Sequence, residues 1–130
     1  RWSPSSGTWE VLRPMLQRRL GATTAVLGGR VHVCGGSDSQ EALNTTERFD
    51  TVCVGGVWEP MPPMSQRRYA AAAAVITGHL YVCGGHDGQQ ALDSAETFDP
   101  VMGTWHALPP MLRQRTGSPT AVVAGRLYVC

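Results

Sequence analysis

The chain has 130 residues, of which 42% are hydrophobic, and its 11 basic and 10 acidic side chains give a formal net charge of +1. Neither sign dominates, so we expect no binding to nucleic acid or to an anionic membrane surface. The longest apolar run, residues 70–76, is far shorter than the roughly 20 residues that a membrane-spanning helix needs.

Taken in chain order, the sequence repeats itself. Residues 29–36 read Gly-Arg-Val-His-Val-Cys-Gly-Gly, and near-copies stand at residues 78–85 and 125–130. Other residues recur at the same steps of 49 and then 47 positions, namely Trp9, Trp58 and Trp105; Met15, Met64 and Met111; Arg19, Arg68 and Arg115; Glu47 and Glu96; Asp50 and Asp99. A fixed period of this size indicates an array of like units, each of which buries its apolar face against a neighbour.

The units predict an all-β chain. We expect residues 1–15 to hold the outer strand of one sheet, residues 20–64 and 69–111 to form two complete four-stranded antiparallel sheets, and residues 117–130 to form the inner strands of a fourth sheet. The alanines of residues 70–74 favour a helix on propensity alone. The equivalent segments hold Gly, Thr and Pro instead, so we predict a strand.

In the second complete sheet, strands are predicted over residues 70–77, 80–83, 95–99 and 104–108. A glycine-rich loop, residues 84–88, separates the second strand from the third. Pro109 and Pro110 end the fourth strand, because proline cannot donate a hydrogen bond to a neighbouring strand.

The glycine pair after a hydrophobic strand, the Glu-x-Phe-Asp strand, the spaced Trp and the Met-x-x-x-Arg linker resemble the kelch repeat over the whole chain. The resemblance implies a kelch-type β-propeller fragment, with two complete blades plus parts of two others of a six-bladed ring. Six such units need about 290 residues, so we expect this chain to be a piece of a longer protein. The sequence departs from the pattern in the long segment 51–57 and at Gln114, which replaces the first arginine of the pairs Arg18-Arg19 and Arg67-Arg68.

The predicted binding residues lie on loops. In an antiparallel blade, the second-to-third connection and the linker to the next blade emerge on one face. The resemblance implies that Arg19, Arg68 and Arg115 bind acidic side chains of a partner there, and a guanidinium can hold a carboxylate with two parallel hydrogen bonds. The alternative is a structural brace, in which each arginine pairs with a carboxylate such as Glu47 or Glu96. The rest of the predicted partner-binding set is Tyr69, His86 and Ser37.

Other recurring residues are assigned to structure. We expect the three repeated tryptophans and methionines in the core, and Glu47 and Glu96 buried and paired. Asp38 and Asp87 are expected to hold the glycine-rich loops by accepting hydrogen bonds from their backbone.

The predicted function is a protein–protein interaction module that binds a protein or acidic peptide. In many relatives the propeller recruits substrates to cullin-RING ubiquitin ligases through a separate BTB domain, and others bind actin, so both roles are expectations from the resemblance. The alternative is a kelch-fold enzyme of the sugar-acid epimerase or copper oxidase type. We predict no catalytic residue, because a catalytic group should break the repeat and none here does so.

No cofactor or metal site is predicted. None of the four histidines forms a His-x-x-x-His pair or joins a cysteine at ligand spacing, and His32 stands where Tyr81 and Tyr128 stand, so we expect it in the core.

The cysteines favour a reducing, cytoplasmic setting. Cys34, Cys83 and Cys130 share one repeat position, which should place them too far apart for disulfides, and Cys53 is expected in a connecting loop. Exposed blade faces and strand edges would favour self-association of the chain.

Overall fold

The computed structural model describes residues 1–52 and 55–130, and every regular element in that part of the chain is a strand. The twelve strands are β1 (Trp2–Ser3), β2 (Thr8–Trp9), β3 (Thr23–Leu27), β4 (Arg30–Cys34), β5 (Thr46–Asp50), β6 (Val57–Met61), β7 (Ala72–Ile76), β8 (His79–Cys83), β9 (Ala95–Asp99), β10 (Thr104–Leu108), β11 (Thr120–Val123) and β12 (Arg126–Val129). The all-β prediction is confirmed. The predicted loop position of Cys53 lies outside the described residues.

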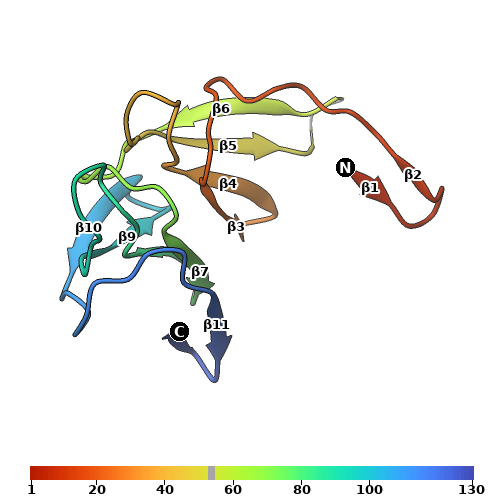
Figure 1. The fold of residues 1–130 in the computed structure, drawn as a ribbon. Helices are drawn as coiled ribbons and strands as arrows, with labels where there is room; N and C mark the ends of the chain where they lie inside the picture. The colour runs from red at the N-terminus through yellow and green to blue at the C-terminus, as the bar shows by residue number, and fades with distance from the viewer. Residues whose placement is uncertain (53–54) are drawn as a thin grey trace.

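The strands form two four-stranded antiparallel sheets, β3-β4-β5-β6 and β7-β8-β9-β10, and two hairpins, β1-β2 and β11-β12. Figure 1 shows these four units following one another along an arc. The innermost strands meet, since β3 packs against β7 and β7 packs against β11. We call β3–β6 the first blade and β7–β10 the second blade.

Backbone hydrogen bonds join the starts of the inner strands. The Ala70 N–H donates to the Gly21 carbonyl at 2.7 Å, and the Gly117 N–H donates to the Ala70 carbonyl at 2.8 Å. Gly21, Ala70 and Gly117 all have positive φ, at 62°, 49° and 65°. This left-handed conformation is not extended, which explains why β7 begins at Ala72 rather than at the predicted residue 70.

The core lies between the two blades. Its buried members come from both sheets and from the linker that joins them: Leu27, Cys34, Met64, Leu80, Val82 and Phe98. Ala71 and Ala73, at the start of β7, pack against this cluster, and their small side chains let the inner strands approach closely. Tertiary packing therefore overrides the helix propensity of residues 70–74.

Tryptophan ties each complete blade to the linker before it. Trp105 packs on Phe98 with ring centroids 5.3 Å apart, and its Nε1 donates to the Pro62 carbonyl at 2.9 Å. In the first blade, Trp58 Nε1 donates to the Arg13 carbonyl at 2.9 Å. The core prediction is wrong for Trp9, which is 79% exposed, because the described chain places no linker against the β1-β2 hairpin.

The repeated cysteines differ in exposure. Cys34 and Cys83 are buried and Cys130 is exposed, and all three are free thiols. Burial raises the pKa of Cys34 to about 12 and also raises the pKa of Cys83. Because the thiolate is the reactive species, both buried thiols should be inert at neutral pH.

We expect iodoacetamide at pH 7.5 to alkylate Cys130 while Cys34 and Cys83 stay unmodified, as measured by mass spectrometry of tryptic peptides. In 8 M urea all three should react. Alkylation of Cys34 at the rate of Cys130 in the folded protein would contradict the described packing.

Candidate partner-binding face

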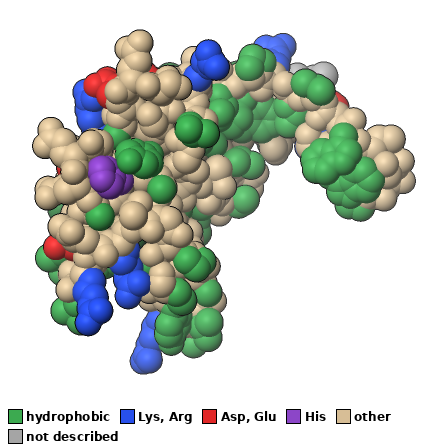
Figure 2. Space-filling model, in the orientation of Figure 1, with side chains coloured by type: hydrophobic (Ala, Val, Ile, Leu, Met, Phe, Trp, Pro, Cys, Tyr) green, Lys and Arg blue, Asp and Glu red, His purple; other side chains and the backbone are tan. Residues whose placement is uncertain are grey.

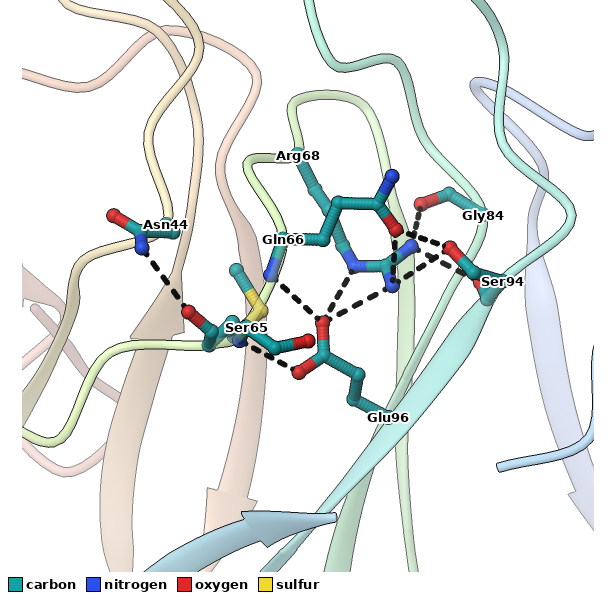
Figure 3. A network of polar contacts seen from close by, with 8 residues as sticks. Asn44, Ser65, Gln66, Arg68, Gly84, Ser94 and Glu96 are labelled. Atoms are coloured by element: carbon teal, nitrogen blue, oxygen red, sulfur yellow. Dashed lines mark hydrogen bonds and ion pairs between the residues drawn. The ribbon is translucent and has the colours of Figure 1, made fainter. Parts of the chain in front are cut away.

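The Arg68 side chain turns into the second blade. Its Nε and Nη2 atoms lie 3.3 and 3.1 Å from Glu96 Oε1, and Nη1 donates to the carbonyls of Gly84 at 2.8 Å and Ser94 at 3.0 Å. Figure 3 shows the guanidinium held between these groups, with Gln66 beside it. Arg68 is 1% exposed and Glu96 is 2% exposed.

The carboxylate of Glu96 also organises the linker. It accepts hydrogen bonds from the backbone N–H groups of Ser65 at 2.8 Å and Gln66 at 3.3 Å (Figure 3). One buried carboxylate thus fixes both the linker backbone and the arginine that follows it.

Arg19 is built the same way in the first blade. Its Nη2 lies 2.8 Å from Glu47 Oε1, and Nη1 donates to the carbonyls of Gly35 at 2.7 Å and Thr45 at 2.8 Å. The side chains of Arg19 and Glu47 are 1% and 3% exposed. The structural brace is therefore the correct alternative for Arg19 and Arg68. The expectation that these two side chains reach a partner's carboxylates is corrected, because their donors are used inside the blades.

The backbone of Arg68 bonds to the opposite neighbour. Its carbonyl accepts from Gly36 N–H at 2.8 Å, and its N–H donates to the Leu43 carbonyl at 2.9 Å, both in the first blade. We call this arrangement the arginine clamp, since the backbone of Arg68 holds one blade and its side chain holds the next. The clamp explains why the glycine pair, the arginine and the glutamate recur together.

Arg115, the third predicted arginine, makes the same backbone contacts as Arg68. Its carbonyl accepts a hydrogen bond from Gly85 N–H at 2.7 Å, and its N–H donates to the Leu92 carbonyl at 2.9 Å. Its side chain is partly exposed and has no ion-pair partner within residues 1–52 and 55–130. Arg115 stays a predicted partner-binding residue.

The exposed arginine of each linker pair is the first one. Arg18 and Arg67 are exposed, and Arg67 forms an ion pair with Glu41 whose side chains are 50% and 55% exposed. In the next repeat Gln90 stands for Glu41 and Gln114 stands for Arg67. Sequence reasoning missed Arg18 and Arg67, although the variation at this position between repeats is the expected sign of a surface residue.

Tyr69 and His86, two of the predicted partner-binding residues, lie against each other. Their rings stack with centroids 5.2 Å apart, and their backbones exchange hydrogen bonds of 3.0 and 2.9 Å. His86 Nδ1 accepts from Gly88 N–H at 3.0 Å, so the neutral ring carries its proton on Nε2. Both residues are partly exposed.

Leu20 and Ser37 hold the equivalent places in the first blade. Their backbones exchange two hydrogen bonds of 2.8 Å, and Leu20 is 73% exposed. The space between these residues and Tyr69 is a shallow cavity of about 340 Å³, also lined by Gln40 and Gly88. We call this the loop-face groove. It brings Ser37 and Tyr69, but not Arg19 or Arg68, to one surface.

Asp38 and Asp87 make the loops beside the groove rigid, as predicted. Asp87 Oδ1 accepts from the backbone N–H groups of Gln89 and Gln90 at 2.7 and 2.8 Å, and Asp38 does the same with Gln40 and Glu41 at 3.0 Å each. The bonds from Glu41 and Gln90 are the largest cause that lowers the pKa of each aspartate. These carboxylates are used by their own loops.

The remaining chemistry of the described residues is limited. Within residues 1–52 and 55–130, no three His, Cys, Asp or Glu side chains lie close enough to hold one metal ion. The same part of the chain contains no helix long and apolar enough to cross a membrane. The groove offers apolar area and rigid loops, and the His86 ring beside it adds an N–H donor, which together suit contact with another polypeptide.

Two four-stranded antiparallel sheets joined through their first strands define a β-propeller fragment. The model of the Kelch motif matches residues 18–65 and 67–112, and the chain belongs to the kelch repeat family. Kelch repeats in general mediate protein–protein interaction.

Among solved structures, the chain is similar to YjhT, with a TM-score of 0.81 and 24% sequence identity. The match covers 92% of this chain and 36% of the YjhT chain, so this chain spans about a third of that structure. At this identity the likeness concerns the fold. No curated protein matches the chain.

Proposed function

We propose that the chain is a protein-interaction module that binds a peptide or loop of a partner protein in the loop-face groove. The observation that carries the proposal is the Tyr69–His86 stack beside Leu20, since these rings and the exposed leucine meet across a blade boundary on rigid loops. Exposed apolar and aromatic groups on a rigid scaffold are the residues that dominate protein interfaces.

The partner segment that fits this groove combines an apolar residue with an acidic one. The apolar residue contacts Leu20 and Tyr69, and His86 Nε2–H donates to a backbone carbonyl. Arg18, which lines a neighbouring cavity together with Leu20 and Ser37, supplies the accessible charge for a carboxylate, in place of the buried Arg19 and Arg68. Recruitment of such a partner to a cullin-RING ubiquitin ligase in the cytoplasm is the wider role that we propose from the family, and the free thiols of the described cysteines are compatible with a reducing compartment.

Self-association is a second proposal for the isolated chain. Figure 2 shows apolar side chains gathered on the β1-β2 hairpin and around β11, the two ends of the arc. Trp9 is 79% exposed and Val123 is 56% exposed there. Apolar faces of this kind favour contact between copies.

Selection of a phage-displayed random peptide library on the purified protein tests the proposed groove. We expect the selected peptides to pair an acidic with an apolar residue, and Tyr69→Ala to weaken their binding by about 10- to 100-fold, which is the usual loss for a central aromatic contact. Affinities are measured by fluorescence polarisation.

Tyr128→Ala is the matched control, because Tyr128 is 47% exposed on β12 and lies outside the groove. It should leave binding unchanged. Selected peptides that bind the Tyr69→Ala and wild-type proteins equally would exclude the groove as their site.

A further inference from the structure

A second cavity, of about 470 Å³, lies between the first and second blades beside their tight turns. The turns at Gly28, Gly78 and Gly103 line it, so it opens away from the loop-face groove. Leu27 and Phe98 contribute an apolar wall. Arg30, His32 and Arg48 of the first blade contribute a polar wall.

The polar wall is a continuous row on one face of the first blade. His32 on β4 stands opposite Arg48 on β5, and Arg48 stands opposite Glu59 on β6. Directly opposed residues on one sheet face have side chains in contact range. The row is therefore set by strand register and not by a mobile loop.

The two guanidinium groups keep unused donors. Arg30 bonds Asp50 Oδ2 through Nε at 3.0 Å, and Arg48 bonds Glu59 Oε2 through Nε at 2.7 Å. Their Nη nitrogens have no hydrogen-bond partner among the residues that the structure describes. A guanidinium carries five N–H donors, so both side chains can still hold an anion from the cavity.

His32 adds a neutral group to the row. It is 4% exposed, and its Nδ1 lies 3.1 Å from the Arg30 carbonyl. Burial is the main cause that lowers the pKa of His32, and the charges of Arg48 and Arg30 lower it further. The carboxylates of Asp50 and Glu59 offset the charges of Arg30 and Arg48, so the row has no net charge. A second negative charge on a ligand would be repelled by these carboxylates, and a ligand with a single negative charge therefore fits the row better than a dianion.

Two of these residues, His32 and Arg48, have no counterpart of the same type in another unit. Arg30 recurs as Arg126 and Glu59 as Glu10. At the positions of Arg30, His32, Arg48 and Glu59, the second blade carries His79, Tyr81, Thr97 and His106. The clamp residues, by contrast, are the same in both blades. A structural requirement of the fold would recur, so the combination of His32 and Arg48 with Arg30 has the distribution of a site that belongs to one blade boundary.

We propose that this cavity binds a carboxylate carried on an apolar group. The carboxylate bonds the Nη donors of Arg30 and Arg48, and the apolar body packs against Phe98 and Leu27. The C-terminal residue of a peptide and a small aryl carboxylic acid share this chemistry. The site is separate from the loop-face groove and does not depend on the function proposed for that groove.

The test uses isothermal titration calorimetry of the protein with 3-phenylpropionate and with N-acetyl-Ala-Phe, each compared with its primary amide. We expect both acids to bind in the micromolar to millimolar range and each amide to bind at least about tenfold more weakly, the loss of one charged hydrogen bond. Tighter binding of the peptide acid would assign the site to a chain terminus, and equal affinity would assign it to small acids.

Arg48→Gln and Arg30→Gln should each weaken the binding of both acids about tenfold or more. Arg126→Gln is the matched control, because Arg126 holds the same turn position as Arg30 two units further along the chain, in the β11-β12 hairpin, but does not line the cavity. Arg48→Lys keeps the positive charge at this position. A melting curve of each variant shows whether it is folded, so that a loss of binding can be told from a loss of folding. Equal binding of acids and amides, an equal loss in Arg126→Gln, tighter binding of phenyl phosphate, or no binding at 10 mM would each overturn the proposal.

Discussion

Replacing Arg68 by alanine is expected to lower the free energy of unfolding by about 3–5 kcal/mol, the usual cost of removing one partner of a buried ion pair. The change leaves the Glu96 carboxylate at 2% exposure with the backbone donors of Ser65 and Gln66 but without its counter-charge. It also leaves the carbonyls of Gly84 and Ser94 without the donors that Arg68 provides. Urea denaturation followed by tryptophan fluorescence measures the loss.

Arg67→Ala is the matched control at the neighbouring position. Its ion pair with Glu41 is about half exposed, so the loss should not exceed about 1 kcal/mol. The double change Arg68→Ala with Glu96→Ala should cost less than the sum of the two single changes, because the second change removes the unpaired charge left by the first. Equal losses in Arg67→Ala and Arg68→Ala would contradict the clamp.

The second large effect is expected for Gly35→Ala, with a loss of at least about 3 kcal/mol in the free energy of unfolding. A Cβ atom at Gly35 would lie 2.1 Å from the Arg68 carbonyl oxygen, and the residue has φ of +62°. The neighbouring atoms are backbone, so relief requires the linker to move away from the first blade. The same measurement by urea denaturation applies.

Gly78→Ala separates the conformational cost from the steric one. Gly78 has φ of +77° but no atom within 4 Å of the added Cβ, so Gly78→Ala should lower the free energy of unfolding by only about 1–2 kcal/mol. A Gly35→Ala protein as stable as Gly78→Ala would show that the glycine pair is there for backbone conformation alone.

The repeat made the fold predictable. The repeat period identified the segments equivalent to residues 70–74, and their Gly, Thr and Pro residues favoured a strand there. Local propensity alone would have assigned these residues to a helix. Strands β9 and β10 were predicted to the residue, because Asp99 and Thr104 flank a turn that the sequence marks clearly. The start of β7 was not predictable, since it depends on the hydrogen bonds of Ala70 to two neighbouring units.

The site was predicted only in part, and the reason lies in how repetition was interpreted. Glu47 and Glu96 were assigned to structure because they recur, and they are buried. Arg19 and Arg68 recur as strictly, and the same reasoning applied to them would have identified the clamp. Tyr69 and His86 vary between repeats and lie on the surface.

The polar row of the first blade could not be predicted from the sequence. His32 was expected in the core; it is buried, but it lines the cavity between the blades and does not belong to the core cluster. Its alignment with Arg48 and Glu59 depends on the register of three strands, which residue types alone do not give.

The arginine clamp has a consequence for how such chains diversify. The Arg68 clamp takes its backbone contacts from one unit and its side-chain contacts from the following unit, so a duplicated stretch of one full period carries a complete set of complementary halves. Gene duplication can then lengthen the array without new stabilising mutations, while positions whose side chains take no part in the clamp, such as Leu20 and Tyr69, acquire separate specificities copy by copy.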